Sequence, residues 1–163
     1  MDTSAPRADA PPRNLTWMEE TGWRARRSLQ AGAVYFLALV GAGWLFGPVR
    51  ESLVRRGLDP LVAMLGEAPA MLFVMVFASA WAVRRFRVMA SSSDRLLVGG
   101  FAVLLVVIAE FVGGALVRGW GFYETLSHMT TAPGAVFGAL LVAAVLAPLF
   151  RRPRRGRSRP ARG

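Results

Sequence analysis

The chain has 163 residues, of which 54% are hydrophobic, and it carries a net charge of +10. Several apolar runs reach about 20 residues, enough to cross a bilayer core of roughly 30 Å, which excludes an ordinary soluble domain. The absence of cysteine excludes disulfides, thiolate metal sites and cysteine nucleophiles. All 20 basic residues are arginines. In a membrane protein, such an excess points to the cytoplasmic side and to anionic lipid rather than to nucleic acid.

The N-terminal region is predicted in two parts. Residues 1–14 combine prolines with small and charged residues. They cannot bury enough apolar surface to fold, so we expect a disordered tail. Residues 15–28 place Trp17 and Trp23 among charged residues. This pattern fits either a short interfacial helix at the lipid headgroups or a charged lead-in to the first span.

Four apolar spans follow, and they predict an all-α integral membrane four-helix bundle over residues 29–150. The spans cover about 29–49, 60–83, 96–117 and 132–150. Because the loop between the second and third spans is short, we expect these two to be antiparallel neighbours.

The second span has a break near 66–69, where the sequence reads Gly66-Glu67-Ala68-Pro69. Proline fits best in the first turn of a helix. We therefore favour a short, partly inserted segment over 59–66 followed by a spanning helix from about 68 to 83. The alternative is one kinked helix over 60–83 with Glu67 buried.

Glycines mark candidate contacts and turns along the spans. Gly43 and Gly47 form a GxxxG pair, which is a weak signal in a chain with 17 glycines. We interpret Gly99-Gly100 as packing glycines rather than as part of a ligand site. The segment 119–123 contains two glycines and three aromatic residues, and it predicts a flexible aromatic turn at the membrane interface.

The C-terminal residues 151–163 form an arginine-rich segment with seven arginines, and we predict a disordered polyarginine tail. Its simplest role is contact with anionic lipid headgroups. The arginines assigned to this contact are Arg151, Arg152, Arg154 and Arg155.

The distribution of arginine predicts the orientation. With both termini in the cytoplasm, 16 arginines lie inside and four lie outside, at positions 50, 55, 56 and 118. The positive-inside rule favours this arrangement over its reverse. Arginine-only basic usage with abundant Ala, Gly, Val and Pro is typical of a GC-rich bacterial genome. The predicted location is therefore the bacterial cytoplasmic (inner) membrane, with a multi-pass topology.

This orientation gathers a polar cluster in the outer half of the membrane, made of Arg50, Glu67, Glu110, Arg118 and His128. An isolated ion in hydrocarbon costs several kcal/mol, so we expect a carboxylate to pair with an arginine inside the bundle. Arg118 follows Glu110 by eight positions and is not quite on the same helix face. We therefore favour Arg50 as the partner of Glu110, in a buried pair that faces an outward-opening pocket.

The chain carries four short motifs in this order: Gly47-Pro48-Val49-Arg50, Glu67-Ala68-Pro69, Val83-Arg84-Arg85-Phe86 and Ala109-Glu110. Their order resembles that in a group of short four-span bacterial inner-membrane proteins of no assigned activity. The resemblance covers roughly residues 33–150. It implies a four-helix membrane fold, and it implies no reaction, ligand or catalytic residue.

Three functions fit these features. The first is a non-enzymatic bundle, a subunit or accessory protein that docks a membrane protein or another copy of itself. The second is an oligomeric transport or proton-handling module that uses Glu67 and Glu110. The third is a membrane-embedded enzyme with an outward-facing acid/base site. No HExxH motif, histidine cluster, nucleophile elbow or phosphate-binding glycine loop occurs, so we predict no catalytic residue, cofactor or metal.

Overall fold

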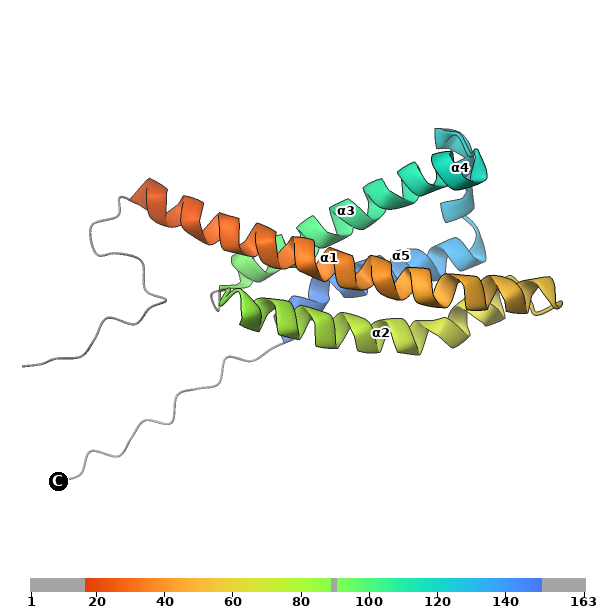
Figure 1. The fold of residues 1–163 in the computed structure, drawn as a ribbon, viewed down its shortest axis with the longest axis horizontal. Helices are drawn as coiled ribbons and strands as arrows, with labels where there is room; N and C mark the ends of the chain where they lie inside the picture. Colours follow the sequence, from red (N-terminus) through yellow and green to blue (C-terminus); the bar gives the residue numbers. More distant parts are fainter. Residues whose placement is uncertain (1–16, 89–90, 151–163) are drawn as a thin grey trace, which may run out of the picture.

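The computed structural model describes residues 17–88 and 91–150, with side chains described over 21–88, 91–116 and 119–150. Within these ranges the regular elements are all helices, and short turns join them (Figure 1). The elements are α1 (Trp17–Arg55), α2 (Pro60–Arg85), α3 (Ser92–Arg118), α4 (Phe122–Met129), α5 (Ala132–Leu146) and the 3₁₀ helix η1 (Ala147–Phe150). The predicted all-α class is confirmed. The two predicted tails, including Arg151, Arg152, Arg154 and Arg155, lie outside the described residues.

Four helices are long and apolar enough to cross a membrane, which suggests a multi-pass membrane protein. Their candidate spans are Thr21–Arg55, Pro60–Arg85, Ser92–Leu116 and Ala132–Phe150. Large apolar side chains point away from the bundle; Trp44 and Leu116, for example, are 82% and 81% exposed. In a bilayer these side chains contact lipid, so their exposure does not carry the penalty that it would in water.

Helix α1 runs without a break for 39 residues, a length of about 58 Å. Two interpretations were open for residues 15–28. From Trp17 onward these residues are continuous with the first span in one helix, which supports the lead-in rather than a separate interfacial helix. The guanidinium of Arg27 lies over the Trp23 ring one turn earlier, 3.9 Å from its centroid. This contact between positions i and i+4 supports the helix before the apolar span begins.

Helix α2 is also a single helix, so the favoured break near 66–69 is wrong and the one-helix alternative is right. Asp59 caps its start: Oδ1 accepts hydrogen bonds from the backbone N–H groups of Leu61 at 2.8 Å and Val62 at 3.2 Å. Pro60 occupies the first turn, where a proline fits well. A start at Ala68 would have no such capping side chain, and Pro69 is instead carried inside the helix.

The long helices do not pack in the order of the chain. Helix α1 packs against both α2 and α3, while α5 and η1 contact α2 and α3 on the side away from α1. Helices α2 and α3 barely touch, so the prediction that they are neighbours is wrong; they lie diagonally across the bundle. Figure 1 shows α3 diverging from the other helices toward α4.

Two glycines allow this arrangement because they let helix backbones meet. A Cβ on Gly32 of α1 would lie 2.9 Å from the carbonyl oxygen of Val98 on α3, and a Cβ on Gly99 of α3 would clash with the backbone of Val145 on α5. Gly99 is thus a packing glycine, as predicted. Gly43 and Gly47 have no such neighbour within 4 Å, so their GxxxG pair makes no contact inside this bundle.

The predicted turn after α3 is present over residues 119–121, and helix α4 begins directly after it. Gly119 ends α3 in the left-handed conformation, with φ 69°, and the N–H of Trp120 donates to the carbonyl of Gly114 at 3.0 Å. A left-handed glycine directly after the last helical residue is a common helix ending. Helix α4 then begins with the Glu124 carboxylate accepting from the N–H of Gly121. It packs back onto α3 through Thr125, whose side chain lies against Gly114.

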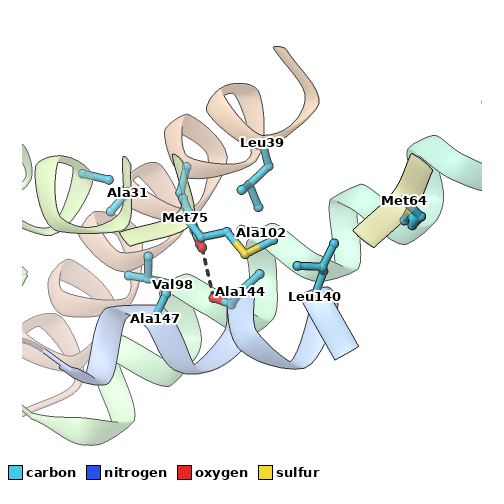
Figure 2. Close-up of a cluster of buried hydrophobic side chains, with 11 residues drawn as sticks. Ala31, Leu39, Met64, Met75, Val98, Ala102, Leu140, Ala144 and Ala147 are labelled. Atoms are coloured by element: carbon cyan, nitrogen blue, oxygen red, sulfur yellow. Dashed lines mark hydrogen bonds between the residues drawn. The ribbon is translucent and has the colours of Figure 1, made fainter. Parts of the chain in front are cut away.

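The core is a column of small and apolar side chains that surrounds one tyrosine (Figure 2). Tyr35 is fully buried, and its hydroxyl donates to the carbonyl oxygen of Ala144 at 3.2 Å, drawn as the dashed line in Figure 2. In a regular helix that carbonyl would bond to the N–H of residue 148, but residue 148 is proline and has no N–H. The N–H of Ala147 donates to the carbonyl of Ala143, so it does not satisfy the carbonyl of Ala144. The tyrosine therefore satisfies a backbone group that a proline has freed.

We predict that Tyr35→Phe lowers stability by about 0.5 to 2 kcal/mol, because the Ala144 carbonyl loses its donor without a change of side-chain shape. In a Pro148→Ala background the restored N–H can replace the hydroxyl, so the same substitution should cost less. Unfolding by SDS in mixed micelles measures both values. Tyr123→Phe is the matched control, since the Tyr123 side chain is 83% exposed. An equal cost of Tyr35→Phe in both backgrounds would contradict this account.

Candidate functional site

The predicted polar cluster is centred on an ion pair between α1 and α2. Nη1 of Arg50 lies 3.3 Å from Oε2 of Glu67, and the Glu67 side chain is only 12% exposed. The same Nη1 lies 3.1 Å from Sδ of Met64, one turn before Glu67 on α2. One guanidinium thus contacts two successive side chains on one face of α2, which fixes the two helices relative to each other.

The position of this pair follows from the local sequence. Arg50 lies one turn before the end of α1, and Glu67 lies two turns into α2. The connection between the helices, residues 56–59, contains Gly57 with φ 97° and the capping residue Asp59, so the chain reverses within four residues. Because α1 and α2 are antiparallel and joined by a short turn, residues at similar distances from the turn lie at similar positions along the two helices. The two charges therefore meet below the ends of both helices.

The predicted partner of Arg50 is Glu110, and the structure gives a different partner. Arg50 is paired with Glu67 rather than with Glu110. Glu110 is a partly buried residue of α3 and takes part in an interaction of its own, so it is not an unpaired carboxylate. The difference has a geometric cause: α3 diverges from α1 and α2 toward α4, which leaves Glu67 as the carboxylate beside Arg50 (Figure 1).

The remaining two members of the predicted cluster, Arg118 and His128, belong to the end of α3 and to α4. The imidazole of His128, in the last turn of α4, lies 5.0 Å from the Trp120 ring, measured between centroids. Arg118 ends α3, and its side chain lies outside the described part of the chain. The sequence analysis missed that α4 carries His128. The spacing from Gly121 to Glu124 is the signal that could have indicated it, since an acidic residue three positions after a helix start caps the helix.

The described residues of this arrangement make contacts between helices. Among the described residues, no three His, Asp or Glu side chains gather closely enough to hold a metal ion. Two hollows lie at the opposite end of the bundle, and their linings do not include Glu67, Glu110 or His128. Arg50 and Glu67 form a charge-assisted contact between helices.

Comparison with protein families, with curated proteins and with solved structures finds no match to this chain.

We predict that Arg50→Leu and Glu67→Leu each lower stability by about 1 to 3 kcal/mol, because each leaves a partly buried charge without its partner. The double variant should recover most of the loss, since two apolar side chains need no partner there. The matched control is the pair Glu51 and Arg55, which is 3.0 Å apart but about two-thirds exposed. Its two leucine variants should show a coupling under about 0.5 kcal/mol.

Unfolding by SDS gives the coupling energy for both pairs. Losses that simply add at Arg50 and Glu67, as they should at Glu51 and Arg55, would show that the inner pair does not connect the helices.

Proposed function

We propose that the protein is a non-enzymatic four-span bundle, a subunit or accessory protein of the bacterial cytoplasmic membrane that docks another membrane protein or a second copy of itself. The observation that supports this most is the Arg50–Glu67 contact, because these two charged side chains pair with each other and join α1 to α2. A transport site would instead need its carboxylates to face a continuous polar path.

Other polar groups of this end are also used within the fold. The Glu124 carboxylate caps the start of α4, and the Thr131 hydroxyl donates to the carbonyl of His128 at 2.7 Å. Oγ1 of Thr131 in turn accepts from the N–H of Gly134 at 3.2 Å and caps α5. Side chains committed to helix ends are poor candidates for general acids or bases, which favours the structural role over an acid/base enzyme.

The proposed orientation places both termini in the cytoplasm and the Arg50–Glu67 pair in the outer half of the membrane. Its support is the arginine distribution. The N-terminal part of α1, the end of α2, the start of α3 and η1 lie at one end of the bundle (Figure 1). In the described residues this end carries seven arginines, against four at the other end. The positive-inside rule assigns the richer end to the cytoplasm.

The proposed partners are the lipid bilayer with its anionic headgroups and, within the membrane, a second copy or another membrane protein. The resemblance of the four motifs between Gly47 and Glu110 to short bacterial four-span proteins is consistent with this role. The polyarginine tail would add headgroup contacts at the cytoplasmic surface.

We predict that reporters active only outside the cytoplasm give signal when fused after Arg56 and after Trp120, and none when fused after Arg87. The reason is that the first two positions lie at the end with fewer arginines. Signal at Arg87 together with silence at the other two positions would reverse the proposed orientation.

Two measurements separate the proposed function from its alternatives. A subunit or accessory protein should retain a defined partner, or a defined oligomer, when it is purified from its native membrane in mild detergent. The same protein in liposomes should give no proton or ion flux above empty liposomes. A flux that Glu110→Gln or Glu67→Gln abolishes, while stability is unchanged, would contradict the proposal and favour the transport module.

A further inference from the structure

Helix α4 connects α3 to α5 and lies beside the end of α3 (Figure 1). It has eight residues, which is too short to cross a membrane. All eight are described, and Thr125 alone among them is buried. A helix of this length is not stable by itself in water. The surroundings of its exposed residues therefore matter for its stability.

Two contacts place α4 alongside the last turns of α3 rather than beyond them. The ring of Phe122 stacks on the ring of Phe111, with 5.2 Å between centroids. A Cβ on Gly114 would lie 3.1 Å from Oγ1 of Thr125. Both α3 residues belong to the candidate span Ser92–Leu116, and Phe111 lies about 8 Å of helix rise before its end. Helix α4 therefore begins within the depth of this span.

The exposed residues of α4 divide into an apolar side and a polar side. Phe122 and Leu126, four positions apart, are 63% and 44% exposed. Glu124 and His128, also four positions apart, are exposed on the nearly opposite side, because successive helix residues are about 100° apart. Tyr123 is 83% exposed and lies next to the apolar side. A helix with this division is typical of a segment that lies in the plane of a membrane surface.

The depth of α4 determines what covers its apolar side. On the neighbouring α3, Val112 and Leu116 are 50% and 81% exposed, and in a bilayer such side chains contact lipid. The Phe122 ring lies at the level of Phe111, the residue before Val112, so the same lipid reaches it. Tyr123 adds a ring with a hydroxyl group, a side chain that is enriched where the membrane meets water.

We infer that α4 is an interfacial anchor whose occupant is the phospholipid surface. Phe122, Tyr123 and Leu126 insert at the boundary between headgroups and acyl chains, while Glu124 and His128 face the water. Interfacial helices bury their apolar side by about 5 to 10 Å, which agrees with the rise of about 8 Å between Phe111 and the end of the span. This inference rests on the membrane placement in the proposed function, and it adds that the connection from α3 to α5 is held in the outer leaflet.

The test uses the absence of cysteine from the chain, which allows one fluorophore to be attached at a chosen position. Leu126→Cys and His128→Cys are the matched pair, because they are two residues apart on opposite sides of α4. Each full-length variant carries a bimane label and is placed in phosphatidylcholine nanodiscs. Its fluorescence is quenched by iodide from the water and, separately, by phosphatidylcholine with a doxyl group near the top of its acyl chain.

The label at position 126 should be quenched several-fold more by the doxyl lipid than the label at position 128, and iodide should give the reverse order. Tyr123→Cys provides a second site on the apolar side, so a folding defect in Leu126→Cys leaves the test intact. Leu116→Cys reports on the span itself and should be quenched by the doxyl lipid rather than by iodide.

Equal iodide quenching of Leu126→Cys and His128→Cys, with Leu116→Cys in lipid, would overturn the anchor alone, because α4 would then lie in water. Shielding of the apolar-side labels from both quenchers would also overturn it, because a second copy or another protein would then cover this side. Iodide quenching of Leu116→Cys would overturn the membrane placement in the proposed function, and the anchor with it.

Discussion

The hydrogen bond from Tyr35 to Ala144 is the contact that holds opposite sides of the bundle together. Helices α1 and α5 are separated by α2 and α3, and the tyrosine side chain crosses the space between them. The bond exists because Pro148 withholds the donor that Ala144 would otherwise use. In hydrocarbon an unsatisfied carbonyl is costly, so a proline is tolerated when a neighbouring helix supplies the missing donor. Pro148 and Tyr35 thus join Gly99 in placing α5 against the other helices.

The number and approximate positions of the four long helices could be predicted from hydropathy, because crossing a bilayer requires a length that the apolar runs supply. Their arrangement could not. A short loop between α2 and α3 indicates antiparallel directions but does not specify which faces meet, and here Gly32 and Gly99 bring α1 and α5 against α3 instead. Gly43 and Gly47 have the better-known spacing yet make no contact. Which glycine packs depends on the face it shares with the buried stripe around Tyr35, and that face becomes visible only when the partners are known.

At the candidate site, the sequence analysis favoured Glu110 as the partner of Arg50, and the structure pairs Arg50 with Glu67. Depth along a span can be counted, so Arg50, Glu67 and Glu110 could be placed near one level. The direction in which each side chain points around its helix depends on how the helices are rotated and how far α3 diverges. The favoured break before Pro69 also moved Glu67 to a helix start, away from Arg50. Once α2 is continuous from the Asp59 cap, Glu67 lies two turns into the helix and faces α1.

The diagonal placement of α2 and α3 has a consequence for biogenesis. A chain is synthesised from its N-terminus, so α2 can pack on α1 as soon as both helices have formed. Helix α3 emerges next but finds almost no surface on α2, so it too must dock on α1. Helix α1 is therefore the template on which the nascent bundle assembles. The side opposite α1 stays open until α5, which follows α3 and α4 in the chain, packs between α2 and α3 and brings the Ala144 carbonyl to the hydroxyl of Tyr35.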